Sequence, residues 1–187
     1  MSKILNGATD FVHSLIKEKI ESDFLCIDAT LGNGYDTLFL LKNLKENGFV
    51  FGFDIQNDAI KNTKKLLKNK NFSKYKLIED SHVNFEKYIK EKIDLVVYNL
   101  GYLPGGDKTI TTKSKSTLKS IKSAMDILKK HGMIFITAYP GHNEGQNELN
   151  LMKNYFKTVD QRNFNIVKLD FYNQVNKPPV IFIIEKR

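Results

Sequence analysis

The sequence is poor in residues that build disulfide or metal frameworks: its 187 residues include one cysteine and no tryptophan. The single cysteine, Cys26, excludes an internal disulfide and a zinc site with several cysteine ligands. It lies in the apolar run 24–27, so we expect it to be buried. The four histidines have no metal-ligand spacing such as HExxH, and we therefore predict no metal site.

Long hydrophobic runs are also absent, because no apolar stretch approaches the roughly 18 residues of a membrane-spanning helix. No signal peptide opens the sequence, so we expect a cytoplasmic protein without membrane association. Hydrophobic residues make up 41% and charged residues 27%, which is the composition of a globular protein. The length fits one domain over residues 1–187, large enough to cover a sheet with helices on both faces.

Acidic residues are fewer than basic ones, with 21 Asp and Glu against 29 Lys and Arg, and the formal net charge is +8. This excess permits a polyanionic partner such as RNA, because lysine and arginine displace the counterions condensed on nucleic acid. Much of the lysine is spread over helix-like stretches such as 61–65, however, and can equally reflect coding bias. Charge alone does not decide between these two interpretations.

Short apolar, β-branched runs alternate with longer amphipathic stretches from residue 24 onward, a pattern typical of βαβ units around a parallel sheet. We predict strands at 24–29, 49–54, 75–79, 94–99, 132–138, 163–170 and 179–185. Helices are expected at 9–20, 36–46, 57–69, 83–90, 114–130 and 145–157.

The segment between the last two predicted strands, FYNQVNKPP at 171–179, is too short and too rich in proline for a crossover helix. The final strand should therefore run antiparallel to its neighbour. We predict an α/β fold of the Rossmann-like class I methyltransferase type. It has a seven-stranded, mostly parallel sheet with an antiparallel last strand and helices on both faces.

A glycine turn, DATLGNGYDT at 28–37, follows the first predicted strand. Ligands of open α/β sheets bind beyond the carboxyl ends of the strands, so this turn should line a binding site. Gly32 and Gly34 allow the backbone to approach a ligand closely. Asp36 and Thr37 then open a helix, whose free N–H groups their side chains can cap.

The composition of this turn distinguishes between cofactors. A phosphate-binding fingerprint requires a glycine where Thr37 stands, and no lysine follows as in a P-loop. The acidic flanks Asp28 and Asp36 would repel a pyrophosphate, but they suit the ammonium and sulfonium groups of S-adenosylmethionine. A glycine turn without a cofactor remains the alternative.

Two later segments add to the predicted cofactor site. Asp54 closes the second strand about twenty residues past the glycine turn, where an acidic side chain can accept both ribose hydroxyls. Asp54 could also cap the following helix, and the two roles are compatible. The loop after the third strand faces the adenine in this fold, so Asp80, Ser81 or His82 should bond the base. Capping by Asp80 or Ser81 is the alternative.

The fourth predicted strand runs into Asn99-Leu100-Gly101-Tyr102, which has the spacing of the (N/D)PP(Y/F) motif of amino-methyltransferases. In that motif the asparagine accepts hydrogen bonds from a target amine and the aromatic ring stacks on its base. Alignment of the amine with the methyl group is a matter of proximity and orientation and needs no metal. The replacement of both prolines puts adenine in doubt as the target, and an ordinary strand exit is the alternative.

Two further loops should face the substrate. Asp107 is a candidate proton acceptor for an ammonium substrate, and Lys108 with the hydroxyl- and lysine-rich residues after it should contact phosphates. A turn followed by a capped helix is the alternative for this segment. After the fifth strand, Tyr139 is placed for stacking and His142 for hydrogen bonding or proton transfer. A loop histidine with neither role is the alternative for His142.

With these residues assembled, the chain resembles a bacterial family of single-domain methyltransferases, long described as putative rRNA methylases. The resemblance is carried by DATLGNGYDT, FGFDIQ, NLGYLPGGDK, the YPGH turn and FYNQVNKPP, and it covers nearly the whole chain. Members of that family methylate the amine of 5-aminomethyl-2-thiouridine at the wobble position of tRNA. The resemblance implies a target amine near residues 99–107. The cofactor contacts that it implies are Asn33, Asp36, Thr37, Asp54, Gln56, Ser81 and His82.

We therefore expect an S-adenosylmethionine-dependent tRNA methyltransferase that acts on the anticodon stem-loop and gives 5-methylaminomethyl-2-thiouridine. A homodimer is compatible with this assignment. Two alternatives stay open: methylation of rRNA or a small-molecule amine on the same scaffold, and an RNA-binding module that keeps the fold without turnover.

Overall fold

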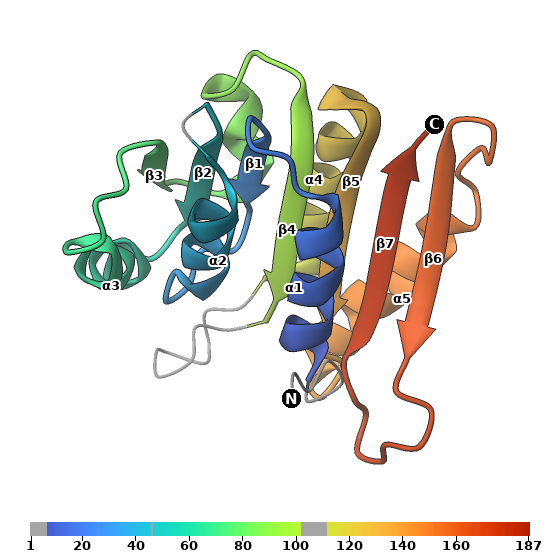
Figure 1. Ribbon diagram of the computed structural model, residues 1–187. Coiled ribbons are helices and arrows are strands. Elements are labelled where there is room, and N and C mark those ends of the chain that lie inside the picture. The colour runs from blue at the N-terminus through green and yellow to red at the C-terminus, as the bar shows by residue number, and fades with distance from the viewer. Residues whose placement is uncertain (1–6, 46, 102–111) are drawn as a thin grey trace.

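The structure of the protein, a computed structural model, describes residues 7–45, 47–101 and 112–187. Figure 1 shows a central sheet with helices packed around it. The strands are β1 (Leu25–Asp28), β2 (Phe49–Asp54), β3 (Tyr75–Glu79), β4 (Ile93–Leu100), β5 (Leu128–Ala138), β6 (Phe164–Asp170) and β7 (Val180–Lys186). The helices are α1 (Ala8–Lys19), α2 (Tyr35–Asn43), α3 (Asn57–Leu67), the 3-10 helix η1 (His82–Lys87), α4 (Ser114–Ile127) and α5 (Asn143–Phe156).

The seven strands form one sheet in the order β3-β2-β1-β4-β5-β7-β6. The pairs among β1 to β5 are parallel, whereas β7 runs antiparallel to both β5 and β6. The predicted class I methyltransferase architecture is confirmed, including the antiparallel last strand. The segment 171–179 is too short for the crossover that a parallel pair requires, so β7 runs back beside β6 in the opposite direction.

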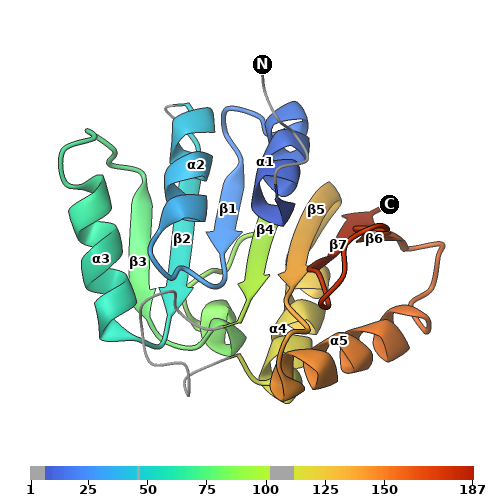
Figure 2. The same ribbon diagram turned by 90° about the horizontal axis from the view of Figure 1, so that it is seen from below.

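Helices cover both faces of the sheet, as the view in Figure 2 shows, and each set of helices packs on the sheet through a buried apolar cluster. Helices α1, α2 and α3 pack on one face, where Val12, Leu40 and Leu67 belong to the same buried cluster as Cys26 of β1. Helices η1, α4 and α5 cover the other face, around Tyr98 of β4. Alternation of side chains along each strand supplies both clusters, and it explains why the strand sequences are apolar almost throughout.

The largest departure from the predicted elements lies between α4 and β5. We expected a helix to residue 130 and a strand from 132, but α4 ends at 127 and β5 begins at Leu128. The register between β4 and β5 shifts here: Leu128 pairs with Ile93, and Met133 pairs with Leu95. The extra residues form a bulge in which His131 has a φ of 63°. Exposed lysines gave this segment the appearance of a helix end.

The predicted helix at 83–90 is also wrong in type, since η1 is a short 3-10 helix over residues 82–87. Its two turns are too few for an amphipathic α-helix, and only Phe85 within it is buried. Among the described residues, no helix is long and apolar enough to cross a membrane.

Candidate functional site

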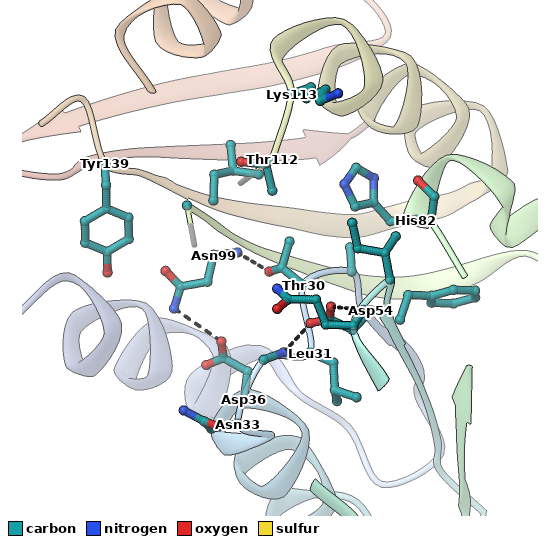
Figure 3. A pocket seen from close by; sticks show the side chains of 18 of the residues that line it. Thr30, Leu31, Asn33, Asp36, Asp54, His82, Asn99, Thr112, Lys113 and Tyr139 are labelled. Atoms are coloured by element: carbon teal, nitrogen blue, oxygen red, sulfur yellow. Dashed lines mark hydrogen bonds between the residues drawn. The ribbon is translucent and has the colours of Figure 1, made fainter. Parts of the chain in front are cut away.

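A cavity of about 1030 Å³ opens at the edge of the sheet where β1, β2, β3, β4 and β5 end. The segments that follow these strands, together with the first turn of α1 and the start of α4, form its walls (Figure 3). The cavity brings together most of the residues predicted to bind cofactor or substrate. Those that line it are Gly32, Asn33, Asp36, Asp54, Gln56, Ser81, His82, Asn99, Tyr139 and His142.

The glycine turn is tight and is tied to the end of β2. Gly34 has a φ of 79°, and its N–H donates to the Leu31 carbonyl at 2.8 Å. The Asp54 carboxylate accepts from the backbone N–H groups of Gly32 and Gln56, each at 2.9 Å. Burial raises the pKa of Asp54, and these hydrogen bonds oppose the shift. The acid and the turn therefore form one structural unit.

Asp28, Gly34 and Thr37 do not line the cavity, although we predicted that they contact the cofactor. Asp28 is fully buried, and it accepts from the Thr37 hydroxyl at 2.7 Å and the Thr30 N–H at 3.3 Å. Burial, reinforced by the charge of Asp36, raises the pKa of Asp28 well above its usual range. These residues shape the turn from behind.

His82 lies on the opposite side of the cavity from Asp36 (Figure 3). Its Nδ1 is shielded from solvent and has no hydrogen-bond partner among the described residues. Burial lowers the pKa of His82 to about 4, so the ring is neutral at physiological pH. A neutral imidazole with an unused nitrogen suits a hydrogen bond to the edge of a purine base.

The neighbours of His82 also act as local caps. Ser81 accepts from the Val83 N–H at 3.4 Å at the start of η1. Asp80 accepts from the Asn84 side chain at 2.8 Å and from the Tyr88 hydroxyl at 2.9 Å. Ser81 and Asp80 therefore make the local hydrogen bonds that we gave as the alternative to base binding. Both residues also border the cavity.

Asn99 is held at two points where β4 ends. Its backbone N–H donates to the Thr30 hydroxyl at 2.7 Å, and its side-chain nitrogen donates to Asp36 Oδ2 at 3.4 Å. The amide therefore sits between the glycine turn and the segment after β5, with Tyr139 on its far side (Figure 3).

The segment after β5 supplies the last predicted residues. The hydroxyl of Tyr139 is hydrogen-bonded to Thr9 of α1, and burial raises the pKa of Tyr139. His142 caps α5, because its Nδ1 accepts from the Gly145 N–H at 3.1 Å. Tyr102, Asp107 and Lys108 lie outside the described residues, so their roles stay predictions.

Several cavity residues were not predicted. Thr9 comes from α1, before the first strand, where no local pattern marks a binding residue. Lys177 lies in the segment 171–179, which we had used only for topology. Lys113, which precedes α4, also lines the cavity, and it belongs to the lysine-rich residues that we predicted to contact phosphates. Within the described part of the chain, no group of three or more His, Cys, Asp or Glu side chains is arranged to hold a metal ion.

Comparison with known proteins finds relatives that are described as methyltransferases or methylases. Residues 50–185 match the family model described as "Putative rRNA methylase". The chloroplastic tRNA (mnm(5)s(2)U34)-methyltransferase of Arabidopsis thaliana is 34% identical over 190 residues, covering 96% of this chain and 69% of that protein.

Solved structures agree in fold over nearly the whole chain. A putative rRNA methylase from Clostridium thermocellum has a TM-score of 0.94 and 40% identity, over 97% of this chain and 98% of that one. SMU.1697c, a putative methyltransferase from Streptococcus mutans solved in complex with SAH, has a TM-score of 0.87 and 32% identity. That match covers 96% of this chain and 97% of the other.

Proposed function

Because the chain belongs to the "Putative rRNA methylase" family and is an S-adenosylmethionine-dependent methyltransferase, we propose that it methylates 5-aminomethyl-2-thiouridine at the wobble position of tRNA. The product would be 5-methylaminomethyl-2-thiouridine. The Arabidopsis relative is named for the same nucleoside at position 34. The observation that carries the proposal is the placement of Asn99 in one cavity with the glycine turn and Asp54.

The residues of the cavity fit S-adenosylmethionine. The Nδ1 of His82, which has no hydrogen-bond partner in the described part of the chain, can bond the adenine, and Asp54 borders the cavity where the ribose hydroxyls would lie. Asn33 and Asp36, at the glycine turn, would contact the methionine end. When bound, the cofactor supplies an electrophilic methyl group on a positively charged sulfur.

The protein would act by orientation rather than by a nucleophile of its own. The Asn99 side-chain oxygen would accept a hydrogen bond from the neutral amine and align its lone pair. In this orientation the nitrogen lone pair would form the new bond to the methyl carbon, and the electron pair of the broken carbon–sulfur bond would stay on sulfur. The nitrogen afterwards loses a proton, for which Asp107 is the predicted acceptor.

The rim of the cavity suits a nucleic acid. Lys113 and Lys177 border it from two separate elements, and both side chains are exposed. Lysines in this position can contact the phosphates on either side of a nucleotide inserted into the cavity. Tyr139 would stack on the modified uracil.

The proposal is tested with the purified protein, S-adenosylmethionine and tRNA that carries 5-aminomethyl-2-thiouridine. Mass spectrometry of the digested tRNA should show conversion to the methylated nucleoside. Asn99→Ala should abolish most of this activity. The control is Asn165→Ala, a substitution of an exposed asparagine on β6, which should leave the activity unchanged. Labelled methyl groups that enter only ribosomal RNA, or only small amines, would reject the tRNA assignment.

A further inference from the structure

Three side chains from separate elements form a continuous chain of hydrogen bonds beside the cavity. His13 of α1 places its Nε2 2.6 Å from Asp36 Oδ1. The second oxygen of Asp36 accepts from the Asn99 side-chain nitrogen at 3.4 Å. Asp36 and Asn99 both line the cavity, whereas His13 lies behind them. No sequence pattern indicated a role for His13.

His13 is held in one orientation by two contacts on the same helix. Its ring stacks on Phe39 of α2, with centroids 3.8 Å apart and planes only 4° from parallel. Phe39 follows Asp36 by one turn of α2, so the stack aims Nε2 at the Asp36 carboxylate. An ionised carboxylate only accepts hydrogen bonds, which requires Nε2 to carry the proton. The side chains of His13 and Asp36 are 19% and 10% exposed, so water competes little for this bond.

The position of Asp36 decides which end of the Asn99 amide faces the substrate. The amide has a donating nitrogen and an accepting oxygen, and only the nitrogen can bond a carboxylate. The oxygen therefore points away from Asp36, toward the side of the cavity where Tyr139 lies (Figure 3). The backbone of Asn99 is separately fixed by Thr30, so rotation of the amide is the remaining freedom.

A reversed amide would present N–H groups to the target amine. These donors would engage the nitrogen lone pair that must attack the methyl group, and the reaction would slow. Asp36 prevents this only if its carboxylate is itself held in place. When the nearby Asp28 carboxyl is ionised, its charge repels that of Asp36 and works against that position.

We infer that His13 is a positioning residue for methyl transfer: it holds the Asp36 carboxylate, which keeps the oxygen of the Asn99 amide directed at the substrate amine. This inference rests on the proposed function, since it assigns His13 a part in that reaction. His13 itself does not line the cavity and need not touch the substrate.

Two substitutions separate the hydrogen bond from the stacking. His13→Phe keeps an aromatic ring on Phe39 but removes the donor, and His13→Gln keeps an N–H donor but removes the ring. We expect His13→Phe to lower kcat by about 10- to 100-fold, while the Kd for S-adenosylmethionine changes by less than about threefold. His13→Gln should recover most of the lost kcat. Glu18→Gln, on the exposed side of α1, is the matched control.

A kcat for His13→Phe that equals that of the unmodified protein would overturn the inference. So would a loss that appears only in the Kd for the cofactor, or equal losses in the Phe and Gln variants. The side-chain NH₂ signal of Asn99 in an NMR spectrum, assigned by its loss in Asn99→Ala, gives a readout without substrate. It should shift in His13→Phe and not in His13→Gln. An unmodified protein that is inactive on the tRNA would refute the proposed function, and the NMR signal would still test His13.

Discussion

The side chain of Asp54 and the backbone of Gly32, 22 residues apart in the chain, are joined by a 2.9 Å hydrogen bond. The second oxygen of the same carboxylate accepts from the Gln56 N–H. These bonds connect the ends of β1 and β2, two neighbouring parallel strands. The glycine turn is therefore set by a residue of a different strand, and a change at Asp54 should alter the turn as well as the ribose contacts that we propose for this residue.

Substitution of Asp54 should weaken cofactor binding. Asp54→Ala removes a charged acceptor with two backbone partners, and hydrogen bonds to charged groups are each worth about 1.5–3 kcal/mol. We expect the Kd for S-adenosylmethionine, measured by calorimetry, to rise by about 10- to 100-fold. Asp58→Ala, at an exposed aspartate in the first turn of α3, should leave it unchanged. Equal affinities for the Asp54 variant and the unmodified protein would contradict this role.

Gly34 should tolerate no side chain. A Cβ at this position would lie 2.5 Å from the Thr63 side chain, and a φ of 79° strains any L-residue. Gly34→Ala should therefore lower the free energy of unfolding by about 1–3 kcal/mol in urea denaturation. Gly141→Ala is the control, because its Cβ would have no neighbour within 4 Å. A Gly34 variant as stable as the control would show that the turn adapts.

Because of His82, the free energy of unfolding should decrease at mildly acid pH. Its pKa is about 4 in the folded protein against 6.5 when unperturbed, so the unfolded state binds more protons between these values. Well above pH 6.5 the ring is neutral in both the folded and the unfolded state, so His82 does not change the free energy of unfolding there. As the pH falls from 7.5 to 5, the unmodified protein should lose about 2 kcal/mol more of its free energy of unfolding than His82→Leu. Parallel losses in the two proteins would contradict the shifted pKa.

Cys26 should be chemically inert while the protein is folded. It is fully buried in β1, and burial raises the pKa of the thiol far above its usual range. Alkylation by iodoacetamide at neutral pH, followed by mass spectrometry, should be at least about a thousandfold slower than in concentrated urea. Rapid labelling of the native protein would mean that β1 opens without global unfolding.

Much of the fold was accessible from the sequence, because the strands are short apolar runs with clear boundaries. The predicted limits of β2 and β3 coincide with those observed. The start of β5 was missed because its first residues include exposed lysines in a bulge, a feature set by pairing with β4. Local composition does not encode such a register shift.

The candidate site was accessible only in part. Strand ends meet at one edge of a parallel sheet, so the cofactor segments and Asn99 could be placed together from the sequence. Which of them face the cavity depends on packing: Asp28 turns inward to Thr37, whereas Asp54 borders the opening. His13 had no local signal at all, since its link to Asp36 exists only once α1 packs beside α2.

The position of β6 in the sheet also constrains how the protein assembles. Among the described strands, β6 pairs only with β7, which follows it in the chain and lies between it and β5. The backbone groups of β6 therefore have no strand to pair with until β7 is in place. We expect the two strands to pair with the rest of the sheet together during folding. In native-state hydrogen exchange, their amides should open as one cooperative unit.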